Sequence, residues 1–180
     1  MSKKNLPSLD QCRKEFFECV QELALINFFG YCMFFECRVE FNDSIPTAVV
    51  RTEFMPTKEG LVGAKPTFEF NREFWSKLSH EERLFLMLHE VRHVESSHGL
   101  RIVQAVGGDP TSREARIANI AADFAVNAGL LKDYNFVVDE LPILREIGAW
   151  ADLHQPPLDE NLSFEEYFYY LLAKYNSEQD

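Results

Sequence analysis

Residues 79–99 read SHEERLFLMLHEVRHVESSHG, and this stretch decides how the rest of the chain is interpreted. Ser79, followed three positions later by Glu82, forms a capping box, which predicts the start of a helix. We expect that helix to span about 80–97, with Gly99 as its terminator. Leucine, phenylalanine, methionine and valine cover most of its circumference, so it should be buried in the core.

Two histidines and a glutamate lie in this helix at the spacing of a metal site. His89 and His93 are four residues apart, which places their imidazoles on one face, roughly 40° apart. Glu90 lies roughly 100° round the helix, so its carboxylate can reach a water on a shared ion without binding the ion itself. Zinc hydrolases use this pattern, in which the ion lowers the pKa of its water to about 7 and a carboxylate accepts the proton. The sequence therefore predicts a zinc site with Glu90 as general base.

The same motif also occurs by chance on exposed helices that bind no metal, where the glutamate is a solvated charge. The apolar residues on both sides of His89 argue against that interpretation. Polar groups on a buried helix need partners, and a metal ion supplies them. We therefore favour the metal site.

His98 is the first candidate for the third ligand. It follows His89 by nine residues, which on a continuous helix is about 180° away. It can bind the same ion only if residues 96–99 unwind and turn the chain back. Otherwise His98 is a helix-terminal histidine stabilised by the helix dipole or by a neighbouring loop.

Asp123 is the second candidate and the one we favour. The segment 117–131, IANIAADFAVNAGLL, is apolar except for Asn119, Asp123 and Asn127, which recur every four residues. A polar line on a buried helix is costly unless it faces a partner. Asp123 can complete a site of two histidines and one acid, with the two asparagines orienting its surroundings. The alternative is that Asp123 only bonds a ligating imidazole or a neighbouring backbone.

The remaining elements follow from periodicity and turn chemistry. The expected elements are an N-terminal helix at 8–29, strands within 32–70, catalytic helices within 80–128 and a C-terminal helix at 163–175. Within the strand region, alternation predicts strands at 33–41, 48–55 and 67–70, with a loop at 56–66. We expect one α+β domain over 1–180, with a small antiparallel or mixed sheet packed on the helix of His89 and on a second, metal-contributing helix.

Several short signals set the ends of these helices. Gly30 should end the first helix, Asp109 and Pro110 should begin the second catalytic helix, and Gly129 should end it. A second capping box, Ser163 with Glu166, should open the last helix. Pro142, Pro156 and Pro157 interrupt the mixed segment before it.

Composition and charge exclude several partners. The formal net charge of -11 repels nucleic acid and anionic lipid, and no apolar run approaches the length of a membrane span or a signal peptide. We therefore expect a cytoplasmic protein.

The four cysteines fit no zinc-finger spacing and are expected to be free thiols: Cys12, Cys19, Cys32 and Cys37.

The order of these motifs resembles a known family. Residues 67–127 contain FEFNREFWSKLSHEERLFLMLHEVRH, then SSHGLR and NIAADFAVN, and LSFEEYFYYLL follows near the C-terminus. Together they resemble the family described as a "putative metallopeptidase domain", found in bacteria and phages and often beside a von Willebrand A-type domain. The resemblance implies a zincin-like fold and a peptide or protein substrate. It also implies His89, His93 and Asp123 as zinc ligands, Glu90 as general base, and His98 as a further site residue.

The sequence departs from the family pattern at two positions. Arg92 places a charge inside the HExxH motif, where it either disturbs the site or binds substrate. Ser97 replaces a family glycine before His98, which changes how freely that turn can bend.

The candidates for stabilising a developing oxyanion are Arg101, Arg116, Tyr134 and His154.

Two other functions remain open from the sequence. One is a zinc hydrolase that acts on a non-peptide amide. The other is a catalytically inactive protein, metal-binding or metal-free, that binds a host or partner protein. The acidic composition and Arg92 favour this last alternative.

Overall fold

The structure is a computed structural model that describes residues 6–58, 60–63, 65–107, 109, 111–136 and 162–177. The chain divides into two compact units, Met1–Val94 and Glu95–Asp180. None of the described helices is both long and apolar enough to cross a membrane.

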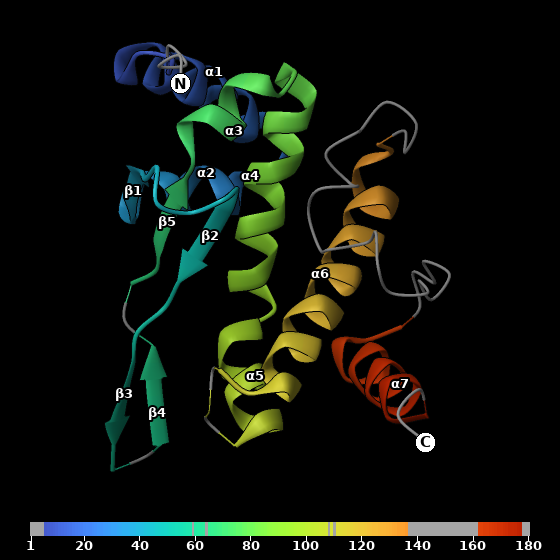
Figure 1. Cartoon of the computed structure of the whole chain (residues 1–180). Coiled ribbons are helices and arrows are strands. Elements are labelled where there is room, and N and C mark those ends of the chain that lie inside the picture. The colour runs from blue at the N-terminus through green and yellow to red at the C-terminus, as the bar shows by residue number, and fades with distance from the viewer. Residues whose placement is uncertain are drawn as a thin grey trace, which may run out of the picture. The chain divides into compact units, whose positions relative to one another are not determined.

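The N-terminal unit combines helices with a small mixed sheet (Figure 1). Its elements are α1 (Leu9–Ile26), α2 (Phe28–Glu36), β1 (Arg38–Phe41), β2 (Ala48–Arg51), β3 (Phe54–Thr57), β4 (Gly60–Gly63), β5 (Thr67–Phe70), α3 (Arg72–Lys77) and α4 (His80–Glu95). Strand β5 lies between β1, to which it is parallel, and β2, to which it is antiparallel. Strands β3 and β4 form a separate antiparallel pair. The expected α+β class with a mixed sheet is confirmed.

Aromatic rings fill the space between this sheet and the helices. Phe16 of α1 meets Phe34 of α2 edge to face, with ring centroids 5.3 Å apart. Phe34 also packs on Phe68 of β5, with centroids 4.8 Å apart, and Phe70 of the same strand packs on Trp75 at 5.4 Å. Each such pair contributes roughly 0.5–1.5 kcal/mol beyond the area that it buries. Phenylalanine, which is abundant in the sequence, therefore supplies most of the rings that pack in this core.

The prediction of one helix over 8–29 followed by a strand from residue 33 is wrong. The backbone N–H of Asn27 donates to the Leu23 carbonyl (2.8 Å), and its side chain accepts a hydrogen bond from Gly30 N (2.6 Å). Asn27 thus ends α1 and caps α2, so Gly30 lies inside a helix rather than terminating one. The strand begins only at Arg38. The alternation of apolar and polar residues over 33–36 predicted a strand, but the cap at Asn27 begins a helix that includes these residues.

The segment expected to be a loop, 56–66, contains β4 and the end of β3, so that prediction is also wrong. The strand predicted at 48–55 is likewise divided between β2 and β3. Pairing of β3 with β4 satisfies backbone hydrogen-bonding groups that would otherwise need water. Strand β5 matches its predicted bounds of 67–70.

The capping box of α4 is confirmed. Ser79 N donates to Glu82 Oε2 (2.8 Å), and Glu82 N donates to Ser79 Oγ (3.2 Å). The helix ends at Glu95, two residues before the expected end, and Gly99 lies in the following helix instead of terminating this one.

The C-terminal unit is helical in its described part, with α5 (His98–Val106), α6 (Arg113–Tyr134) and α7 (Phe164–Ser177). Ser112, not Asp109, caps α6, and the helix continues past Gly129. Asp109 instead accepts from the Thr111 backbone N–H at 2.9 Å.

The second capping box, at the start of α7, is confirmed. Ser163 N donates to Glu166 Oε2 (2.7 Å), and Glu166 N donates to Ser163 Oγ (3.3 Å). The helix runs two residues beyond the expected end, to Ser177. The three prolines predicted to interrupt the preceding segment lie outside the described residues.

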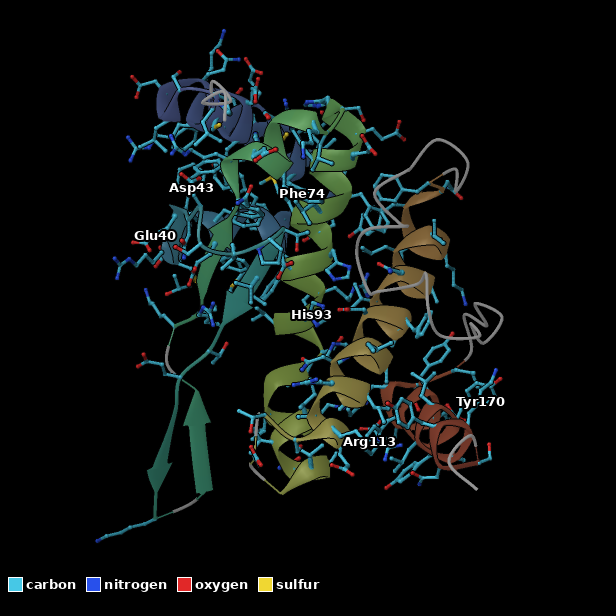
Figure 2. All side chains as sticks on the ribbon, in the orientation of Figure 1. Glu40, Asp43, Phe74, His93, Arg113 and Tyr170 are labelled. Atoms are coloured by element: carbon cyan, nitrogen blue, oxygen red, sulfur yellow. The ribbon has the colours of Figure 1, made fainter. Side chains whose placement is uncertain are left out.

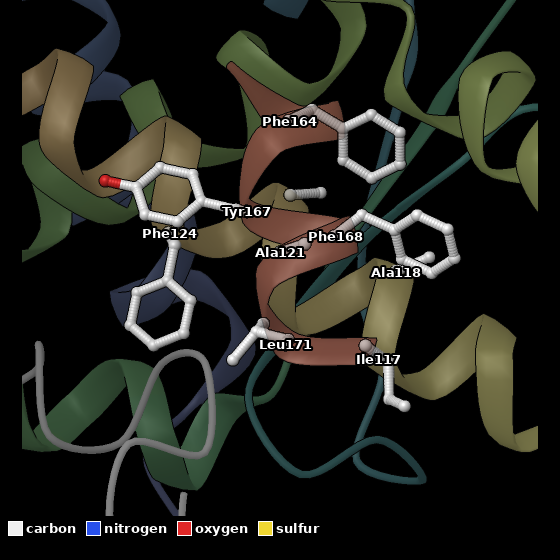
Figure 3. Packing of buried hydrophobic residues seen from close by; sticks show 9 residues of the cluster. Ile117, Ala118, Ala121, Phe124, Phe164, Tyr167, Phe168 and Leu171 are labelled. Carbon is white, nitrogen blue, oxygen red and sulfur yellow. The ribbon is translucent and has the colours of Figure 1, made fainter. Parts of the chain in front are cut away.

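The core of this unit lies between α6 and α7 (Figure 3). Ala118 and Ala121 of α6 are fully buried and leave room for the rings of Phe164 and Phe168 on α7. Phe124 stacks on Tyr167 with ring centroids 5.7 Å apart. Small residues on one helix and aromatic residues on the other allow close packing, which fixes α6 within the unit.

Glu69 leads to a prediction about acid stability. This buried carboxylate on β5 accepts hydrogen bonds from Asn42 Nδ2 (2.6 Å) and Arg51 Nε (2.8 Å). The bond from Asn42 first, and then the one from Arg51, hold the pKa of Glu69 below its usual value. Because the pKa of Glu69 is lower in the folded state than in the unfolded state, ionised Glu69 stabilises the fold above the unfolded-state pKa. This stabilisation is lost as the pH falls through the folded-state pKa.

We expect Glu69→Gln to lower the free energy of unfolding at pH 7 by about 1–2 kcal/mol, because charge-assisted hydrogen bonds are lost. We also expect it to flatten the fall in stability on acidification. Urea unfolding between pH 7 and pH 3 measures both effects. Glu36→Gln is the matched control, since its ion pair with Lys65 is largely exposed on both sides. Equal pH profiles for wild type and Glu69→Gln would contradict the prediction.

Candidate metal centre

Helix α4 brings the two histidines of the motif together. His89 is 2% exposed, and its Nε2 lies 3.0 Å from Nε2 of the half-buried His93. Their ring centroids are 4.7 Å apart, with the planes steeply inclined to each other. Figure 2 labels His93 on this helix. The one-turn spacing read from the sequence thus corresponds to two rings on one side of α4.

The separation of these nitrogen atoms fits a shared ion. Two ligand nitrogens bound at about 2.0–2.1 Å in tetrahedral geometry stand about 3.3 Å apart. The observed 3.0 Å between the two Nε2 atoms is close to that value. A small outward movement of either ring therefore suffices to admit a tetrahedral cation.

Glu90 and Arg92 complete the motif on α4. Glu90 is 6% exposed, so its carboxylate has lost most of its contact with bulk water. Burial of a carboxylate is costly, and a nearby cation offsets that cost. Arg92 is half-buried. The motif thus carries a second charge of opposite sign to Glu90.

The polar residues of α6 differ in their surroundings. Asn119 is exposed, and its Nδ2 donates to the Ala115 carbonyl of its own helix (2.9 Å). Asp123 is half-buried, and Asn127 is fully buried. With His89 and His93, Asp123 makes up a set of three side chains that could hold one metal ion, each offering one ligand atom.

His98 is buried within the C-terminal unit. The chain turns at Ser97, which adopts the left-handed conformation (φ 52°), and α5 then begins at His98. The His98 ring packs on that of Phe164, with centroids 5.6 Å apart, and His98 is 3% exposed. A glycine at position 97 would adopt this conformation without the steric cost that serine incurs.

An ion pair lies beside His98. Arg101 Nε donates to Glu165 Oε1 (2.9 Å), and the guanidinium lies over the Phe164 ring at 5.1 Å. The hydrogen bond from Arg101 holds the pKa of Glu165 below its usual value. These partners are 64 residues apart in sequence, so no local pattern could have predicted the pair. Arg101 is therefore already engaged in holding α5 to α7.

The other candidates for stabilising an oxyanion are placed as follows. Arg116 is exposed on α6, and Tyr134, at the end of that helix, has its ring 6.1 Å from that of Phe136. His154 lies outside the described residues.

The cysteines are free thiols, as expected. Burial raises the pKa of Cys19 to about 12, which leaves its thiol protonated and unreactive at neutral pH. Burial also raises the pKa of Cys12 and of Cys37.

Comparison with known proteins places the chain in a family. No curated protein matches the chain, and no solved structure matches it. Residues 58–175 match the family described as "Putative metallopeptidase domain". The matched span is more than half of the 180 residues and includes all of α4, α5 and α6. It therefore contains the histidine pair, Glu90 and the polar residues of α6, and the chain belongs to the "Putative metallopeptidase domain" family.

Proposed function

We propose that this protein is a zinc-dependent peptidase in which His89, His93 and Asp123 bind the metal and Glu90 is the general base. The observation that carries the proposal is the pair of imidazole nitrogens 3.0 Å apart on α4, where the residue after His89 is the buried Glu90. The family match supports metal-dependent peptidase chemistry. The fold that we propose is zincin-like.

Asp123 is proposed as the third ligand in preference to His98. Among the described residues, the set able to share an ion contains Asp123 with the two histidines. The ring of His98 instead packs on Phe164 in the C-terminal unit. A carboxylate also adds the negative charge that a site of two neutral imidazoles lacks. Since His89 and Asp123 belong to different units, we propose that residues 1–180 act as one functional domain.

Two imidazoles and one carboxylate are the donor set of many catalytic zinc sites. A bound zinc ion supplies Lewis-acid polarisation of the scissile carbonyl and lowers the pKa of a coordinated water. Glu90 accepts the proton of the attacking water and delivers it to the leaving amine. The apolar residues of α4 around the motif exclude bulk water, which strengthens the electrostatic interactions of Glu90.

A binding protein without catalytic activity is the second candidate. The specific observation in its favour is a group of exposed apolar side chains on α1 and α2: Leu25, Ile26, Phe28, Phe29 and Phe35. Exposed apolar groups that lie close together are typical of protein interaction surfaces. This candidate predicts zinc binding, or none, without turnover of any peptide.

Zinc binding and peptide cleavage by the full chain distinguish these candidates. We expect calorimetry to show one zinc ion bound per chain, and quenched-fluorescence peptide libraries to be cleaved. Removal of zinc with a chelator should abolish cleavage, and zinc should restore it. Zinc binding without cleavage of any library would favour the binding protein. Failure to bind zinc would overturn both the metal site and the peptidase.

A further inference from the structure

A cavity lies between α1 and the edge of the sheet in the N-terminal unit. Its volume is about 620 Å³, within the range of small-ligand and side-chain pockets. Four of the lining residues are phenylalanines, and one is a cation: Phe16, Phe17, Phe34, Phe41 and Arg13. Arg13 precedes the two phenylalanines of α1 by three and four residues, which places the three side chains on one helix face.

The sheet edge beside this cavity is open in the described part of the chain. β1 is at the end of the strand order, and β5 is its only described partner. The backbone N–H of Asn42 donates to the Phe70 carbonyl of β5 (2.9 Å). Because successive residues of a strand direct their backbone groups to opposite sides, Val39 and Phe41 present theirs to the open edge. Both residues also line the cavity.

The charges around the cavity are not balanced. Glu40 and Asp43 line it as well, but Glu40 is paired with Arg38, and Asp43 with Arg72. Figure 2 labels both acidic residues near β1. Arg13 makes no ion pair with the residues that the structure describes. The cavity therefore offers aromatic surface and one uncompensated positive charge, in a chain whose net charge is -11.

We propose that this cavity binds an extended peptide segment that pairs with β1, inserts a large apolar side chain among the phenylalanines, and places a carboxylate on Arg13. Strand addition to an open edge supplies backbone hydrogen bonds, and pockets for alternate side chains supply specificity. Alternate residues of a strand share a face, so the apolar and acidic residues are two positions apart. The site is separate from the metal-binding residues and does not depend on the proposed peptidase activity.

The test uses a fluorescently labelled, capped eight-residue peptide with Phe-Thr-Glu at its centre, and a second peptide with Phe-Thr-Gln. Anisotropy titrations are made on the full chain with and without a zinc chelator, and mass spectrometry checks that the peptide stays intact. We expect Arg13→Gln to weaken binding of the Glu peptide about fivefold and to leave the Gln peptide unchanged, because only the first has the ion pair. Binding should survive chelation.

Two controls test the geometry. Lys14→Gln changes the neighbouring cation, which is exposed and pairs with Glu18, and should leave both affinities unchanged. A Glu peptide with N-methyl groups on alternate amides cannot pair with β1 and should bind at least about tenfold more weakly.

Three results would overturn the proposal. The first is that the Glu peptide does not bind at about 1 mM. The second is that the methylated peptide binds as tightly as the unmethylated one. The third is that Arg13→Gln weakens binding of the Glu and Gln peptides by the same factor. A dimer of the chain that Arg13→Gln dissociates, without peptide binding, would assign the cavity to a second copy and would also overturn it.

Discussion

Replacement of Glu90 by glutamine is expected to leave zinc bound and to lower kcat against a peptide substrate by at least about a hundredfold. Glutamine keeps the shape of the side chain but cannot accept the proton of the attacking water. Glu90 is not among the proposed ligands, so the metal content of the variant should equal that of the wild type. Steady-state kinetics together with zinc analysis of the same sample measure both quantities.

Glu81→Gln is the matched control, because Glu81 is exposed in the first turn of the same helix. It should retain the activity of the wild type. If Glu90→Gln keeps zinc and also keeps its activity, Glu90 is not the general base. If it loses zinc, the carboxylate belongs to the ligand set, and the assignment of roles must change.

The second large effect concerns the third ligand. We expect Asp123→Ala to weaken zinc binding more than about a hundredfold, as His93→Ala should, because loss of a direct ligand exceeds the 10–100-fold cost of losing a supporting residue. His98→Ala should change the affinity less than about tenfold. Its main effect should be on folding, since truncation beside Phe164 leaves a cavity that costs about 1–3 kcal/mol. Competition titrations with a zinc-binding dye and thermal unfolding separate the two effects.

Asp133→Ala controls for the change of charge, because Asp133 is exposed on the same helix, α6. It should leave zinc affinity unchanged. The reverse result, in which His98→Ala loses zinc and Asp123→Ala retains it, would make His98 the third ligand. Loss of zinc in both variants with unchanged thermal stability would place both side chains on the ion.

Features that depend on neighbours within one or two turns could be predicted from the amino-acid sequence. Both capping boxes form as expected, because serine and glutamate three residues apart satisfy each other's backbone N–H groups. The approach of His89 to His93 follows from a spacing of four in any α-helix. The placement of two of the three proposed ligands on one helix face could therefore be deduced without tertiary structure, whereas the third, Asp123, lies on another helix.

Features that depend on distant residues could not be predicted from the sequence and follow from the packing of the folded chain. Burial of Phe34 between Phe16 and Phe68 favours a helix where alternation predicted a strand. The break before that helix, by contrast, is local, because Asn27 caps it through the backbone N–H of Gly30. The pair of Arg101 with Glu165 and the cavity beside β1 join residues far apart in sequence. Periodicity records which face of an element is apolar, but not which distant element covers it, because that depends on packing of the whole chain.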